Sequence, residues 1–353
     1  MVSFFGKKTA NWVGIDIGSS FVKLVVLSKR GGLIGLDAYA VVSLPPTAVI
    51  DGSIQEVQSV ADAIARGTKI CGIKQGSAIA AVPSSAVIIK RMELSRAFSE
   101  IELEDQVKVE ADQFIPYPLD EVALDFEIIG ESRSHPDLNE LLLVACRRDD
   151  VDQREDAINA TGLKCAVVDV DTYAVERVFP MLVNEDLKND DMVAIVDIGA
   201  ATLTLNVIRD HKIIYNREQS FGGNDLTTNI HHQYGMAIDE VEQSLRLGEI
   251  SDEIQEAVVQ PFRLTISQQV SRALQFFYSS GVQHQLTKIY LCGGASSIDG
   301  LVGILSDELG IPVSIANPFT QMTIGVKVNK ERLVKDAPAL VKACGLALRS
   351  FDQ

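Results

Sequence analysis

The sequence has few cysteines and no long apolar segment. Its 5 cysteines form no C-x-x-C pair, which argues against a zinc site or a disulfide scaffold and favours buried, reduced thiols. No window approaches the roughly 20 apolar residues of a membrane-spanning helix, and the N-terminus has no apolar stretch long enough for a signal peptide. The sequence therefore predicts a soluble, cytoplasmic protein.

Positive charge is also scarce. The 32 Lys and Arg residues face 48 Asp and Glu residues, for a formal net charge of −16. This balance argues against nucleic acid or an anionic membrane surface as the main partner. With 353 residues, 46% of them hydrophobic and 23% charged, the composition is globular and long enough for two domains.

Two short segments have nearly the same pattern. Val13–Ser20 and Val193–Thr202 each run from an apolar stretch into Asp-x-Gly and then into small or hydroxyl residues, and a second apolar run follows. This pattern predicts a hairpin. Its glycine lets N–H groups approach a phosphate, and an Asp at the strand end can hold Mg²⁺ through water. Either hairpin alone is more often an ordinary turn. Two together predict a nucleotide site in which one hairpin binds the phosphates from each side.

A third element supports this interpretation. Lys288–Ser297 is a buried-type strand that ends in Gly-Gly and small residues, a surface on which a flat ring or a ribose can lie. The order of the three elements resembles the actin, Hsp70 and hexokinase ATPase superfamily. The resemblance implies an α/β fold with two duplicated actin-like (ribonuclease H-like) domains around a nucleotide cleft.

The predicted elements divide the chain into two domains. Residues 1–185 with 325–353 form the first domain, and residues 190–324 form the second. The polar stretch Glu185–Asp191 is the linker candidate. Within the first domain, a strand, an acidic helix and two strands predict a small inserted α+β subdomain at about 84–165.

The insert carries a more specific resemblance. Glu110–Phe126, with its Pro-Tyr-Pro core, resembles the segment that marks the PilM family of type IV pilus assembly proteins, and the likeness runs from Trp12 to about Arg349. Two prolines fix φ and hold the aromatic ring in an extended presentation, although a rigid loop without a partner is the simpler alternative. The related cell-division protein FtsA continues into a linker and an amphipathic membrane helix. Here the sequence stops at Gln353, which favours PilM.

The resemblance implies a cytoplasmic, ATP-binding adaptor of the inner-membrane complex that assembles type IV pili for twitching motility. Such an adaptor captures the short N-terminal cytoplasmic tail of the inner-membrane protein PilN. It would lie at the inner membrane through this partner without inserting, and self-association stays open. In the family the tail lies in a channel bordered by the insert. The candidate contact residues are Phe114, Ile115, Pro116, Tyr117, Pro118 and Leu119.

The superfamily motifs also imply nucleotide contacts. Asp16 and Asp197 would order the waters around Mg²⁺, and Lys23 would neutralise phosphate charge. Gly222-Gly223 resembles a nucleotide-side turn, although such residues more often cap a helix. On the following helix only Glu242 and Arg246 match the expected pattern. The expected nucleotide-binding set is Asp16, Gly18, Ser19, Ser20, Lys23, Asp197, Gly199, Ala200, Ala201, Thr202, Gly222, Gly223, Glu242, Gly293, Gly294, Ala295 and Ser296.

One departure from the superfamily concerns hydrolysis. Chaperone and filament relatives place Glu or Gln after the strand that leads into the domain-linking helix, where it positions the attacking water. Val170 falls at that position, and Asp169 or Asp171 would orient water poorly. The sequence therefore predicts that ATP is bound and hydrolysed slowly or not at all. The alternatives are an active ATPase, a sugar-kinase-like phosphotransferase and an FtsA-like filament-forming actin homologue.

Overall fold

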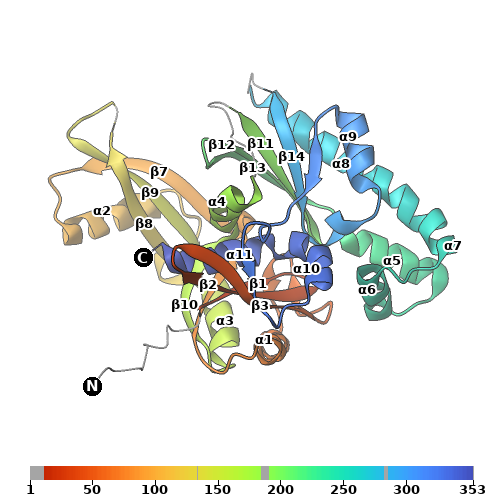
Figure 1. Ribbon diagram of the computed structural model, residues 1–353. Coiled ribbons are helices and arrows are strands. Elements are labelled where there is room, and N and C mark those ends of the chain that lie inside the picture. The colour runs from red at the N-terminus through yellow and green to blue at the C-terminus, as the bar shows by residue number, and fades with distance from the viewer. Residues whose placement is uncertain (1–11, 133, 184–190, 282–284, 353) are drawn as a thin grey trace.

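The chain folds around two β-sheets with two helices between them (Figure 1). A computed structural model describes residues 12–132, 134–183, 191–281 and 285–352. Apart from Asp191, the linker candidate Glu185–Asp191 lies outside the described residues.

The first sheet has the strand order β10-β6-β1-β2-β3-β16. Its outer face is covered by α1 (Val57–Cys71) and α3 (Arg148–Asn159), whose buried side chains repeat at helical spacing. Gly72, with a φ of +72°, ends α1 in the left-handed conformation that glycine adopts readily. A short hairpin, β4 (Val49–Ile50) and β5 (Ser53–Ile54), precedes α1. The strands are β1 (Trp12–Ile17), β2 (Phe21–Arg30), β3 (Leu33–Ser43), β6 (Ser77–Val82), β10 (Lys164–Val170) and β16 (Thr323–Ile324).

The second sheet has the order β13-β12-β11-β14-β15. Every residue of β11 is buried, because helices cover both faces of this strand. The strands are β11 (Met192–Ile198), β12 (Thr202–Arg209), β13 (Lys212–Ser220), β14 (Leu286–Cys292) and β15 (Val313–Ile315). The helices of this half are α5 (Gly223–Tyr234), α6 (Ile238–Leu247), α7 (Asp252–Ile254), α8 (Gln260–Ser279) and α9 (Leu301–Leu309).

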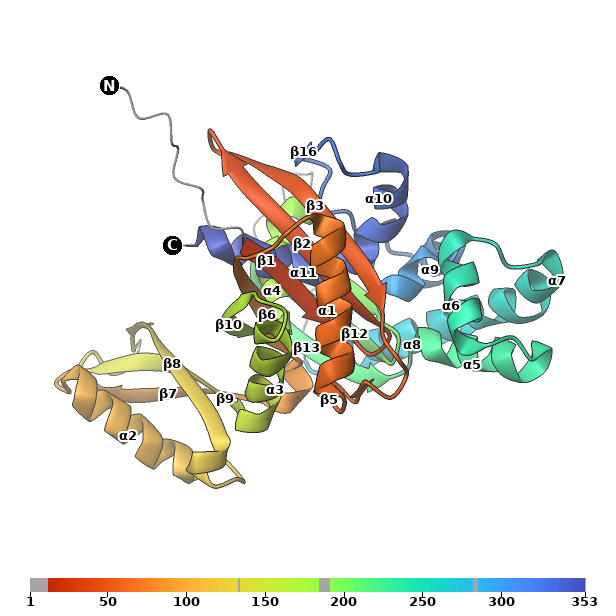
Figure 2. The same cartoon turned by 90° about the horizontal axis from the view of Figure 1, so that it is seen from below.

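The insert projects from the first sheet (Figure 2). Its antiparallel strands have the order β7-β9-β8, and Ser99 and Glu102 form a capping box at the start of its helix. Its elements are β7 (Val87–Ser95), α2 (Glu100–Asp112), β8 (Val122–Glu131) and β9 (Leu138–Arg147).

The insert is shorter than the predicted 84–165. Its sheet ends at Arg147, and the next helix, α3, packs against α1 instead. Ala157 and Ile158 of α3 are fully buried in one core with Val60 and Ile64 of α1. Because this core belongs to the first sheet, α3 is part of the first half of the molecule.

Two helices, α4 (Asp171–Leu182) and α11 (Val341–Leu348), fill the space between the two sheets. The chain reaches α11 from β16 through α10 (Lys330–Asp336). Their core includes Val25 from the first sheet and Ile195 from the second. The two halves therefore share one hydrophobic core at this place.

The approach of α11 to its neighbours depends on two glycines. A Cβ on Gly345 would lie 1.9 Å from the carbonyl oxygen of Ala174 in α4, and a Cβ on Gly14 of β1 would lie 2.2 Å from the carbonyl oxygen of Ala343. Real Cβ atoms do not reach such distances, so backbone atoms on both sides of α11 would have to move. The position of α11 is therefore fixed by direct backbone packing.

We predict that Gly345→Ala lowers the free energy of unfolding by about 3 kcal/mol, because the added methyl group overpacks this contact. The control Gly303→Ala lies inside α9 with nothing within 4 Å of its ideal Cβ. It should raise stability by about 0.5–1 kcal/mol through helix propensity. Urea unfolding measures both values. Equal effects of the two substitutions would contradict the close packing of α11.

Candidate functional site

The two predicted hairpins are present and have the same turn. β1 pairs with β2 so that Asp16 lies opposite Lys23, and β11 pairs with β12 in the same antiparallel way. The N–H of Gly18 donates to the carbonyl oxygen of Phe21 at 3.0 Å, and the N–H of Gly199 donates to that of Thr202 at 2.8 Å. The duplicated hairpin prediction is therefore confirmed in its geometry.

Side chains connect the first hairpin to the second half of the molecule. The hydroxyl of Ser20 donates to Oδ1 of Asn224 in α5 at 3.1 Å. Ser20 also hydrogen-bonds Glu242 of α6, while burial raises the pKa of Glu242 above its ordinary value. The structure thus brings Ser20 and Glu242, two of the predicted site residues, together where the first hairpin contacts α5 and α6 of the second half.

The first turn of α5 supports the second hairpin. The N–H groups of Gly223 and Asn224 donate to the carbonyl oxygens of Gly199 and Ala200 at 2.9 and 2.8 Å. A Cβ on Gly222 would lie 2.4 Å from the Ala200 oxygen, so this position requires glycine. The Gly222 N–H donates to the carboxylate of Asp225 at 3.0 Å. These N–H groups are engaged within the protein, which favours the capping interpretation of Gly222-Gly223.

The third predicted element packs directly against the second hairpin. Gly293 has a φ of +86°, and a Cβ there would lie 2.3 Å from Oδ1 of Asp197. Ser296 is buried and its hydroxyl donates to the carbonyl oxygen of Gly293 at 2.7 Å, so it closes the turn. An ideal Cβ on Gly294 meets nothing within 4 Å. Gly294 is exposed, so a side chain at this position of the turn would meet only open space.

Lys342, in the first turn of α11, was not among the predicted site residues, yet it lies between two aspartates from different elements. Its Nζ lies 2.8 Å from Oδ2 of Asp197 and 3.1 Å from Oδ2 of Asp171. Burial opposes its charge, but Asp197, Asp171 and Asp16 outweigh this and hold the pKa of Lys342 well above its ordinary value. Lys342 is the one charged residue in the apolar run Val341–Leu348, and this was the available signal.

Lys23 pairs with Asp16. Its Nζ lies 2.8 Å from Oδ2 of Asp16. Burial would raise the pKa of Asp16, but Lys23 and Lys342 together hold it below its ordinary value. Lys23 therefore neutralises a carboxylate of the protein itself in this structure.

The residues present do not fit the predicted magnesium site. Asp16 and Asp197, its two expected members, each already pair with an ammonium group. Within the described ranges, no group of three or more His, Cys, Asp or Glu side chains could hold a metal ion. This part of the cofactor prediction has no support in the geometry.

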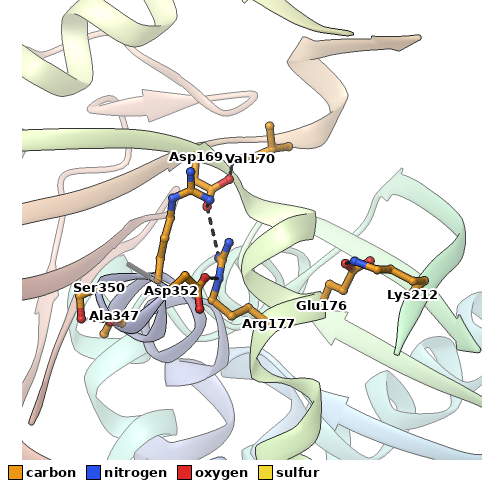
Figure 3. Close-up of polar contacts among 9 residues, drawn as sticks. Asp169, Val170, Glu176, Arg177, Lys212, Ala347, Ser350 and Asp352 are labelled. Atoms are coloured by element: carbon orange, nitrogen blue, oxygen red, sulfur yellow. Dashed lines mark hydrogen bonds and ion pairs between the residues drawn. The ribbon is translucent and has the colours of Figure 1, made fainter. Parts of the chain in front are cut away.

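The carboxylates beside Val170 are also engaged. Figure 3 shows Asp169 beside Arg177, which reaches Asp352 near the C-terminus. Asp169 lies 3.2 Å from Arg177 and 3.2 Å from Arg349. Asp171 accepts the N–H of Ser84 at 2.9 Å with Oδ1, while Lys342 contacts its Oδ2. Neither carboxylate is free to orient a water molecule.

A separate groove lies where the insert meets the first sheet. It is a cavity of about 320 Å³ bounded by β8, β9, α3 and β10. Apolar side chains form its wall and carboxylates lie at its rim. The lining includes Leu124, Asp125, Ala145, Val151, Ala166 and Val168.

The predicted partner segment Phe114–Leu119 is not among the residues that line this groove. Ile115 is buried in the core of the insert, and the Lys90 ammonium lies 3.7 Å from the centre of the Phe114 ring. The Arg147 guanidinium lies 4.5 Å from the centre of the Tyr117 ring. A role of this segment in partner binding stays a prediction.

Comparisons with known proteins identify the family. The family model described as "Type IV pilus assembly protein PilM" matches residues 14–351. The chain belongs to the PilM family. A solved structure described as a PilM-PilN type IV pilus biogenesis complex is 27% identical, with a TM-score of 0.76 over 96% of this chain and 97% of that one. The resemblance predicted from the insert is therefore confirmed.

A second solved structure, the ethanolamine utilization protein EutJ from Carboxydothermus hydrogenoformans, has the same fold. It is 17% identical, with a TM-score of 0.56 over 96% of this chain and 90% of that one. The predicted actin-like α/β fold of this PilM-family chain is confirmed. In the part of the chain that the structure describes, no helix is both long and apolar enough to cross a bilayer.

We predict that Asp169 of this PilM-family chain has a structural role. Asp169→Asn should lower the free energy of unfolding by about 2–4 kcal/mol, because it leaves Arg177 and Arg349 without their buried carboxylate. The control Lys212→Ala breaks the exposed pair with Glu176, which Figure 3 also shows, and should change stability by less than about 0.5 kcal/mol. Denaturant unfolding checks both. An effect of Asp169→Asn as small as that of the control would contradict this role.

Proposed function

We propose that this PilM-family chain is a cytoplasmic, nucleotide-binding adaptor of the type IV pilus machine, held at the inner membrane by its partner. It binds the N-terminal cytoplasmic tail of a PilN protein in the groove between the insert and the first sheet, and ATP in the cleft. The observation that carries the proposal is that two edge strands of the described sheets, β8 and β10, line one cavity, in a chain similar to the PilM of a solved PilM-PilN complex.

The groove suits an extended peptide. β10 is the last strand of the first sheet, β8 is the last strand of the insert sheet, and both contribute to the groove. Edge strands have N–H and C=O groups without a partner strand, and an extended peptide pairs with such edges. Alternate side chains of the bound peptide would then enter the apolar wall.

The charges at the rim predict the composition of the peptide. Asp125, Asp152 and Glu155 lie at the groove, opposed by Arg148. The Arg148 guanidinium already donates to the carbonyl oxygens of Asp120 and Val122. A tail with alternating apolar side chains and at least one basic residue therefore fits best.

We predict that Ala166→Trp blocks tail binding. Ala166 is exposed in the groove on β10, so an indole there occupies the space of the peptide without disturbing the core. Affinity for a fluorescent peptide that copies the cytoplasmic tail of the cognate PilN should fall at least about tenfold, as when a central contact is lost. Fluorescence anisotropy measures it.

The matched control is Ala160→Trp, an exposed alanine after α3 that does not line the groove. It should bind the peptide like the wild type. Equal affinity of the two tryptophan variants would place the tail elsewhere. Tyr117→Ala in the same assay tests the segment Phe114–Leu119, and a loss of affinity there would extend the site to this segment.

The engaged carboxylates support slow or absent hydrolysis. Val170 is 4% exposed, and Asp169 and Asp171 are each fixed by at least two polar contacts. We predict that ATP bound to the purified protein stays intact, with turnover far below about 1 per second, a typical enzyme rate. Chromatography of radiolabelled nucleotide checks this. Turnover at ordinary enzyme rates would contradict the assignment.

A further inference from the structure

We propose that the ε-ammonium of Lys342 replaces the divalent cation in the nucleotide cleft, so that this protein binds ATP without Mg²⁺. The inference rests on the proposed nucleotide-binding function. It adds that a side chain of the protein, the ammonium of Lys342, supplies the positive charge between the two phosphate hairpins.

The first reason is the position of the ammonium group. Asp197 ends the strand that leads into the second hairpin turn, and Asp171 begins α4. Lys342 contacts both carboxylates, at 2.8 and 3.1 Å, from the first turn of α11. A cation is therefore already present beside the hairpin turn that was expected to hold phosphate.

The second reason is that four oxygens of these carboxylates already have partners in the protein. Oδ2 of Asp197 contacts Lys342, as does Oδ2 of Asp171. Oδ1 of Asp171 accepts the Ser84 N–H, and Oδ2 of Asp16 accepts from Lys23. A hydrated Mg²⁺ needs such oxygens as acceptors for its water ligands, and it would compete for them with the two ammonium groups and the Ser84 N–H.

The third reason is that Lys342 cannot easily leave. Its helix is fixed by the backbone contacts at Gly14 and Gly345, and its side chain is only 19% exposed. Moving the ammonium away would leave Asp171 and Asp197 partly buried without a counter-charge, which is unfavourable. A fixed ammonium can donate to phosphate oxygens without prior binding of a metal.

The experiment compares ATP binding by the wild-type protein in excess EDTA and in MgCl₂, using isothermal titration calorimetry. We expect the two dissociation constants to agree within about threefold. The loss of one charge-assisted hydrogen bond would change the dissociation constant by more than this. Loss of binding in EDTA, restored by MgCl₂, would overturn the inference while leaving the proposed nucleotide function intact. No binding in either buffer would overturn both. This comparison needs no variant and so does not depend on whether a variant folds.

A variant separates the role of Lys342 from a purely structural one. Lys342→Met should weaken ATP binding in EDTA by at least about 30-fold, and MgCl₂ should restore part of it, because the vacated carboxylates can then hold the ion. The matched control Lys330→Met, at an exposed lysine of α10, should behave like the wild type.

A second readout uses no nucleotide. MgCl₂ should raise the thermal unfolding midpoint of Lys342→Met by several degrees and leave that of the wild type unchanged, since only the variant has free carboxylates for the ion. A wild-type midpoint that rises with MgCl₂ as much as that of the variant would contradict the inference. If Lys342→Met does not fold, the wild-type arm of the same titration still decides.

Discussion

The contact of α11 with both halves of the molecule is the constraint on which the rest of the structure depends. Gly14 and Gly345 allow its backbone to touch β1 and α4, so the helix has one possible position. From that position its single charged side chain, Lys342, reaches Asp171 and Asp197. The eight residues of α11 therefore have two roles. They pack in the shared core, and through Lys342 they balance the charges of Asp171 and Asp197.

The junction of β10 and α4 connects the two proposed sites. Asp169 lines the groove and pairs with Arg177 and Arg349, while Asp171, two residues later, faces Lys342 in the cleft. β10 ends at Val170 and α4 begins at Asp171, so the backbone changes from strand to helix between the two aspartates and one short segment contributes to both sites. A peptide that pairs with β10 would lie next to the element that holds the cation of the cleft.

The sequence was most informative where the signal is local. Asp-x-Gly between two apolar runs predicted both hairpins, because a turn residue and strand periodicity act over a few positions. The partners of Lys342 could not be found in this way, because Asp171 and Asp197 belong to distant elements, although its position in an apolar run is a local signal. The end of the insert differs from the predicted residue 165 for a similar reason: whether α3 belongs to the insert depends on the packing of Ala157 and Ile158 against α1. The groove was not predicted, because it depends on the order of the strands in the two sheets, and the sequence pattern does not specify that order.

Hydrogen–deuterium exchange of the full-length protein, with and without the PilN tail peptide, tests most directly whether this chain is an adaptor that binds by strand pairing. The backbone amides of β8 or β10 that have no partner strand exchange freely in the unbound protein and should gain strong protection with the peptide. The outer strand β13 of the second sheet should not change. Protection confined to other elements, with β8 and β10 unchanged, would contradict the proposed function of the groove.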